Sequence, residues 1–93
     1  MDSVIAYREI EGMAWHPHRV AFGERLRKLR QERGLSQEAF AHHVGLDRTY
    51  VSGLERGRRN PTLDVIVKLA EALEVQPAAL LEWREVPPEN DAH

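Results

Sequence analysis

The stretch that decides the fold of this chain runs from Gln37 to Arg56 and reads QEAFAHHVGLDRTYVSGLER. Apolar residues recur at helical spacing on both sides of Gly45, which predicts two short helices joined by a tight turn. Such a turn needs a residue that tolerates positive φ, and Gly45 does so without a Cβ clash. Ala41 is small enough for the point of closest approach, and Val51 is a branched residue that packs the second helix onto the first.

The remaining inward positions of this stretch are apolar as well. They are filled by Phe40, Val44, Leu46 and Leu54. Seven positions therefore agree in type and spacing with a helix-turn-helix, in which two helices cross steeply through a short turn. The alternative is an ordinary helical hairpin built from the same residue types. The basic residues that flank the stretch favour the helix-turn-helix.

The flanking sequence predicts three more helices. The first begins at Val20 and ends at Gly34, a residue type that commonly follows the last turn of a helix. The fourth helix follows the motif, and the fifth opens at Pro77, since proline suits a first helical turn. Candidate N-caps precede the second, third and fourth helices: Ser36, Asp47 and Thr62. We therefore expect an all-α fold of five helices without a strand.

The length of 93 residues allows one domain, which we place at residues 20–84. An arm at residues 1–19 receives no assigned structure, and residues 85–93 form a short acidic tail. A core this small is marginally stable unless a partner subunit adds apolar surface. The chain has no cysteine, no signal-like start and no apolar run near the roughly 20 residues of a membrane span. We expect a soluble cytoplasmic protein.

Charge is unevenly distributed along the chain, although the formal net charge is only −2. Residues 19–59 carry ten Arg or Lys side chains against five carboxylates. Residues 60–93 carry two basic side chains against seven acidic ones. Because local charge steers ligands more than total charge does, the middle of the chain is the candidate surface for a polyanion. A solvated basic helix is the alternative interpretation.

The chain resembles the Cro/phage-repressor-type helix-turn-helix family, also called the xenobiotic-response-element family. The resemblance covers residues 20–83 and includes LRKLRQERGLSQ before the motif and ERGRRNPTLDVIVKLAEAL at its exit. It implies a five-helix, lambda-repressor-like domain that binds double-stranded DNA operators as a dimer. Within the family, DRTYVSGLERGRRN is most similar to the controller proteins of restriction-modification systems.

The resemblance places a recognition helix at residues 47–55, whose first turn would meet base edges in the major groove. The residues that correspond to base-contacting positions are Arg48, Thr49, Tyr50 and Ser52. Arg48 can bond guanine O6 and N7 with two parallel donors. The residues expected to bind phosphates are Gln37, Arg58, Arg59 and Asn60. Such contacts fix the position of the protein along the DNA duplex but do not distinguish one base sequence from another.

Three further positions stand out beside the family pattern. Gly53 is a departure, because many relatives place a longer polar side chain there; close packing against the DNA backbone is one explanation. Arg30 and Glu55 match a family pair in which the first helix is salt-bridged to the end of the recognition helix. A capping or solvated role for Glu55 is the alternative.

A pseudo-palindromic operator requires a two-fold protein, so we expect a homodimer. The interface is placed on the fourth and fifth helices, at Leu73, Val75, Leu80 and Trp83. No residue pattern indicates a cofactor, a small-molecule ligand or an enzyme. The adjacent His42 and His43 point about 100° apart on a helix, so they do not converge on a metal.

The sequence thus predicts a sequence-specific transcriptional regulator. An antitoxin that binds a protein toxin and autoregulates its operon is the main alternative, although the segments outside the domain leave little room for a toxin-binding tail. A helix-turn-helix used only for protein contacts is a third possibility.

Overall fold

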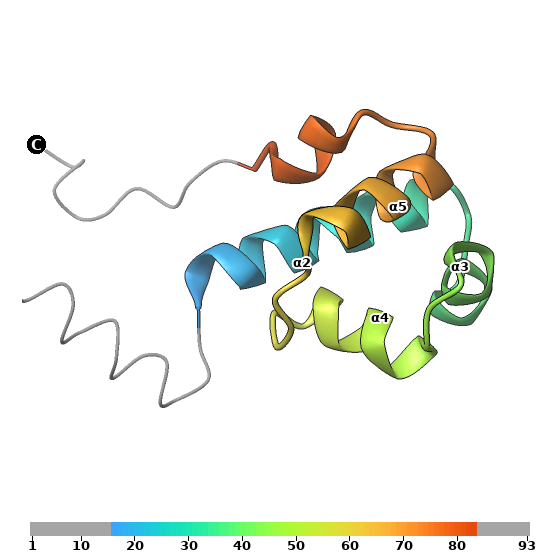
Figure 1. Ribbon diagram of the computed structural model, residues 1–93, viewed down its shortest axis with the longest axis horizontal. Helices are drawn as coiled ribbons and strands as arrows, with labels where there is room; N and C mark the ends of the chain where they lie inside the picture. The colour runs from blue at the N-terminus through green and yellow to red at the C-terminus, as the bar shows by residue number, and fades with distance from the viewer. Residues whose placement is uncertain (1–15, 84–93) are drawn as a thin grey trace, which may run out of the picture.

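The computed structural model describes residues 16–83, so the predicted tail at 85–93 and most of the arm at 1–19 lie outside the described residues. Four α-helices follow one another: α2 (Pro17–Glu32), α3 (Gln37–Val44), α4 (Arg48–Glu55) and α5 (Leu63–Leu73). A 3₁₀ helix, η1 (Pro77–Leu81), completes the order, and residues 16–83 contain no strand (Figure 1). Within the same range, no helix is long and apolar enough to cross a membrane.

Two predicted boundaries are corrected by the structure. The first helix begins at Pro17 rather than Val20, because proline has the fixed φ and missing N–H that suit a first turn. The prediction of a fifth α-helix is wrong, because residues 77–81 form only a 3₁₀ helix that ends before Trp83. Five residues are too few to repay nucleation of an α-helix. The Nε of Arg25 also donates to the Ala79 carbonyl oxygen at 2.7 Å, tying this segment to α2.

Local capping chemistry sets the other helix ends much as the sequence predicts. The Ser36 hydroxyl accepts a hydrogen bond from the Ala39 N–H at 3.0 Å, and Thr62 accepts one from Val65 at 3.1 Å. Asp47 occupies the N-cap position of α4 without a side-chain cap bond. Gly45 ends α3 at φ 85°, a conformation that glycine adopts at no steric cost.

The core lies among helices that contact one another in turn, since α2 packs on α4 and η1, and α5 packs on η1 and α3 (Figure 1). Each helix contributes apolar side chains to it, and η1 adds one leucine. Its buried members are Phe22, Leu26, Leu29, Phe40, Ala41, Val51, Leu54, Leu69, Ala70, Leu73 and Leu80. Figure 1 shows α4 along the edge of the molecule opposite η1, so no helix of residues 16–83 lies over its outer face.

Gly23 allows the backbones of α2 and α4 to approach closely. A Cβ at this position would lie 2.4 Å from the Leu54 carbonyl oxygen and 2.5 Å from that of Glu55. Real Cβ atoms essentially never lie so close to another heavy atom, and neither carbonyl belongs to a flexible side chain. The position of the last turn of α4 against α2 therefore depends on the absence of a side chain at residue 23.

We predict that Gly23→Ala destabilises the domain by about 1–3 kcal/mol or more, because the added methyl group forces α2 and α4 apart. In an unobstructed helix the same substitution would gain about 1 kcal/mol. Urea unfolding followed by circular dichroism measures the change. Glu24→Ala, at the exposed neighbouring position of α2, is the control and should stay within about 0.5 kcal/mol of the parent. A Gly23→Ala variant as stable as the parent would contradict the packing described.

Candidate DNA-binding surface

The helix α4 separates an apolar inner face from a polar outer face. Val51 and Leu54 are completely buried against the rest of the domain. Arg48 and Thr49 are exposed in the first turn, while Tyr50 and Ser52 are half-buried. The four residues predicted to contact bases therefore lie on one helix, and the first two project from its leading end.

The loop that leaves α4 carries the predicted phosphate-binding residues Arg58, Arg59 and Asn60, all of them exposed. It turns sharply at Gly57, whose φ is 76°. A Cβ on Gly57 would lie 2.8 Å from the Cγ2 of Val20, so the loop packs directly on the first turns of α2. The Arg58 N–H donates to the Gly53 carbonyl oxygen at 2.8 Å. These contacts hold the basic loop beside α4.

Gln37, the remaining predicted phosphate contact, has its side chain engaged within the protein. It is the first residue of α3, and its Nε2 donates to Glu55 Oε1 at 2.9 Å. What Gln37 can offer to a phosphate is therefore chiefly its backbone N–H, one of those that a first helical turn leaves without an intrahelical acceptor.

Arg30 and Glu55 form a two-pronged ion pair inside the domain. The Nε of Arg30 donates to Glu55 Oε2 at 2.6 Å, and Nη2 donates to Oε1 at 3.0 Å. The two side chains are only 9% and 2% exposed. Nη1 donates to the Leu35 carbonyl oxygen at 2.6 Å, so each charged group has several partners. The alternative solvated role for Glu55 is wrong, because its carboxylate is buried.

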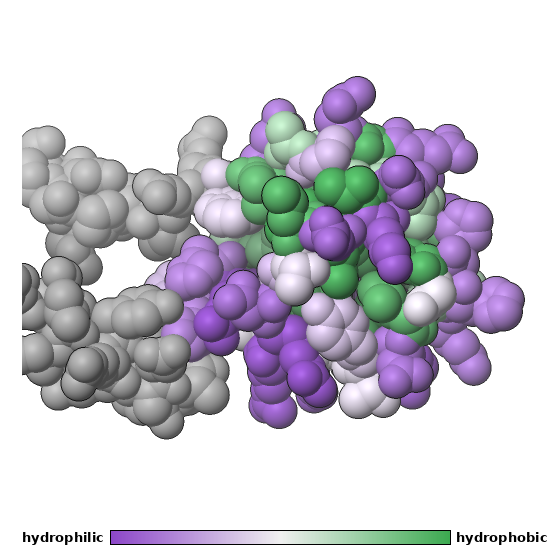
Figure 2. All heavy atoms as spheres, in the orientation of Figure 1, coloured by the Kyte–Doolittle hydropathy of each residue, from purple (hydrophilic) through white to green (hydrophobic). Residues whose placement is uncertain are grey.

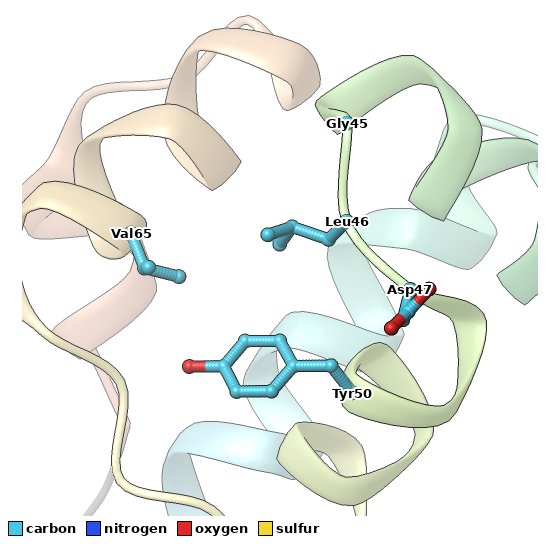
Figure 3. A pocket seen from close by; sticks show the side chains of 5 residues that line it. All are labelled: Gly45, Leu46, Asp47, Tyr50 and Val65. Carbon is cyan, nitrogen blue, oxygen red and sulfur yellow. The ribbon is translucent and has the colours of Figure 1, made fainter.

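Figure 3 shows an open pocket between the turn of the motif and the start of α5. Its lining comprises Gly45, Leu46, Asp47, Tyr50 and Val65. The Tyr50 ring extends from α4 toward α5 and belongs, with Leu46 and Val65, to the apolar residues packed against the core. Tyr50 therefore has one side against the protein, whereas Arg48 and Thr49 are exposed.

The histidines in the described range do not assemble into a metal site. His42 and His43 are exposed on α3. Among residues 16–83 no group of three or more His, Cys, Asp or Glu side chains could hold a metal ion.

The predicted dimer contacts need revision. Leu73 and Leu80 have no exposed surface, because they complete the core of a single chain. Val75 and Trp83 are half-buried and pack against that core. The sequence pattern could not separate these roles, since a core leucine and an interface leucine look alike. Within residues 16–83, the large apolar residues that do face solvent are Leu63 at 72%, Val67 at 36% and Leu81 at 51%.

These exposed residues belong to α5 and η1. Figure 2 shows hydrophobic side chains gathered across the middle of the face that α5 occupies in Figure 1. Hydrophilic side chains cover the lower edge, where α4 and the loop after it lie. The face in this view therefore exposes apolar side chains in its middle and hydrophilic ones around its edges.

Comparison with known proteins identifies the family to which this arrangement belongs. A family model described as Helix-turn-helix matches residues 26–80, more than half of the chain. The chain belongs to the helix-turn-helix family. Control protein C.BamHI of Bacillus amyloliquefaciens is 46% identical to this helix-turn-helix protein over 66 residues, which cover 70% of this chain and 82% of that protein.

Two solved structures extend the comparison. The restriction-modification controller protein C.AhdI from Aeromonas hydrophila matches with a TM-score of 0.69 and 54% identity, covering 70% of this chain and 98% of that one. The controller protein C.Esp1396I, as a tetramer in complex with its natural 35 base-pair operator, matches with a TM-score of 0.66 and 34% identity. That match covers 73% of this chain and 90% of the other. This helix-turn-helix protein is a regulator of transcription.

Proposed function

We propose that this helix-turn-helix protein binds a specific double-stranded DNA operator as a homodimer, with α4 of each subunit in the major groove. The observation that carries the proposal is the exposed leading end of α4, where Arg48 and Thr49 project beyond a helix whose inner face is buried. A major groove admits a helix whose first turn points toward the base edges. Arginine can then bond guanine O6 and N7 with paired donors.

The loop after α4 supports the same orientation. Arg58 and Arg59 follow Gly57 directly and are held beside α4 by backbone contacts to Gly53 and by packing on Val20. Cations next to a recognition helix can neutralise the phosphates that border the groove, which supplies affinity without sequence discrimination. Base contacts and phosphate contacts therefore come from adjoining segments of one continuous stretch.

The apolar surface formed by Leu63, Val67 and Leu81 is the proposed dimer contact. These residues belong to α5 and η1, and none of them is among the residues predicted to contact DNA. A small domain gains stability when such surface is buried by a second copy. The tetrameric state of the operator-bound C.Esp1396I supports self-association, as does the two-fold symmetry of pseudo-palindromic operators.

The relatives support a role as the controller of a restriction-modification system over the antitoxin alternative. Both C.BamHI and C.AhdI are named as control or controller proteins. Adjacent genes for a methyltransferase and an endonuclease would agree with this assignment, whereas a toxin gene would favour the alternative.

We predict that Arg48→Ala and Arg58→Ala weaken binding in different ways. With an operator selected from random DNA, Arg48→Ala should lose about 1–3 kcal/mol of discrimination at one base pair. Arg58→Ala should weaken all sequences alike and reduce the slope of log affinity against log salt by about 1. Fluorescence anisotropy with single-base operator variants at several salt concentrations measures both effects. Identical behaviour of the two variants would contradict the division of roles.

We predict that Leu63→Glu combined with Leu81→Glu converts a dimer into a monomer, since both substitutions place charge on the proposed apolar contact. Sedimentation equilibrium at tens of micromolar protein would follow the change. Ala39→Glu, an exposed position on α3, should leave the dimer intact. A parent protein that is already monomeric under these conditions would disprove the homodimer.

A further inference from the structure

A small hollow lies between the start of α2, the loop after α4 and the end of η1. Its volume is about 110 Å³, and its walls are formed by the apolar side chains of Phe22, Pro61, Ile66, Leu81 and Trp83. Apolar cavities of roughly 150 Å³ can hold a benzene molecule, so this hollow has the size of a somewhat smaller apolar group. Because the walls come from separate elements, no single stretch of sequence predicts the hollow.

The polar side chains that line the hollow all carry N–H donors. They are His18, Arg19 and Asn60. An amide and a neutral imidazole can also accept a hydrogen bond, but the guanidinium of Arg19 has donors only and a permanent charge. Among the residues that the structure describes, the lining contains no Asp or Glu side chain. The hollow therefore combines apolar walls with a cationic edge.

The side chain of Arg19 differs from those of Arg25 and Arg30 on the same helix. Arg25 donates its Nε–H to the Ala79 carbonyl oxygen at 2.7 Å, and Arg30 donates its own to Glu55 Oε2 at 2.6 Å. The Nε of Arg19 is buried as well, yet within residues 16–83 it has no hydrogen-bond partner. A buried donor without an acceptor costs free energy, and more so when the group is charged. Arg19 therefore favours an acceptor from outside these residues.

A second copy of the chain, packed through the proposed dimer contact, does not supply that acceptor. The contact consists of Leu63, Val67 and Leu81, whose side chains are apolar. Small-molecule sites, in contrast, are concave and mostly apolar, with a few polar groups that orient the ligand. The hollow follows this pattern on a small scale, and its charge calls for an anion.

We propose that this hollow binds small apolar carboxylates, the class of short-chain carboxylic acids. The hydrocarbon part would lie against Phe22 and Trp83, and the carboxylate would accept hydrogen bonds from the guanidinium of Arg19. The proposal goes beyond the proposed function, because it involves no DNA. Since Asn60 also lines the hollow, the ligand would lie next to the loop that carries the predicted phosphate contacts.

The test uses the full-length chain with Trp15→Phe, so that Trp83 in the wall of the hollow is the only tryptophan. Pentanoate is the probe and 1-pentanol is its uncharged match, both at constant ionic strength. We expect pentanoate to change the Trp83 fluorescence with a Kd on the order of 1 mM, since a ligand of few atoms gains limited free energy. 1-Pentanol should bind about 10-fold more weakly or less tightly still, because hydrogen bonds between charged groups are the stronger ones.

Three variants locate the site. Arg19→Gln should weaken pentanoate binding by about 10-fold or more and leave 1-pentanol binding unchanged. The matched control Arg27→Gln removes a charge from an exposed position of α2 outside the lining, and should alter neither affinity. Ile66→Phe fills the hollow and should weaken both probes, with thermal unfolding as the check that each variant is folded. If Ile66→Phe fails to fold, the amide chemical shifts of the parent decide the location, and pentanoate should move those of Phe22, Ile66 and Trp83.

Equal affinities for pentanoate and 1-pentanol, or an Arg19→Gln variant that binds pentanoate as tightly as the parent, would overturn the inference. So would shift changes that fall outside the lining. Pentanoate binding that disappears as the protein dimerises would show that a second copy covers the hollow. Tighter binding in Glu85→Gln would show that the carboxylate of Glu85, just beyond Trp83, is the occupant. Either result would contradict a small-molecule site, and neither bears on operator binding.

Discussion

The arrangement of this domain depends on one buried ion pair between Arg30 of α2 and Glu55 at the end of α4. The same carboxylate accepts a hydrogen bond from Gln37 at the start of α3, and Arg30 also bonds the carbonyl of Leu35 before that helix. One charged group thus joins α2 and both helices of the motif. Buried charges are tolerated only when every one of them is paired and hydrogen-bonded, so this network has a restricted geometry.

The pair acts together with the close packing at Gly23 to determine the direction of α4. Gly23 brings α2 against the carbonyl groups of Leu54 and Glu55 in the last turn of α4. The ion pair holds the same turn through the side chain of Glu55. With its last turn clamped, α4 presents its first turn, including Arg48, to solvent. The function follows from this asymmetry, since the constrained end carries structural residues and the free end carries the residues proposed to contact bases.

The sequence was informative where a local rule applies. The caps at Ser36 and Thr62 and the positive φ of Gly45 depend on neighbouring residues alone, and they were predictable. The Arg30–Glu55 pair came from family resemblance, since no local pattern links positions 25 residues apart.

The features that the sequence did not reveal are tertiary. Helical spacing shows which residues are apolar but not what covers them, so it predicts an interface role for Leu73 and Leu80, which a single chain already buries. The need for glycine at position 23 depends on how near α4 lies. The Arg59 side chain over Gly53 depends on the path of a loop. A short 3₁₀ helix in place of a fifth α-helix likewise reflects its attachment to α2 through Arg25.

The most direct test of the account is the coupling free energy between Arg30 and Glu55, obtained from urea unfolding of Arg30→Met, Glu55→Leu and the double variant. Each single substitution should destabilise the domain by about 3–5 kcal/mol, because it leaves the other charge buried without its partner. The double variant should lose much less than the sum of the two. Additive losses would mean that the two charges do not constrain each other, and would contradict the account of how α4 is held.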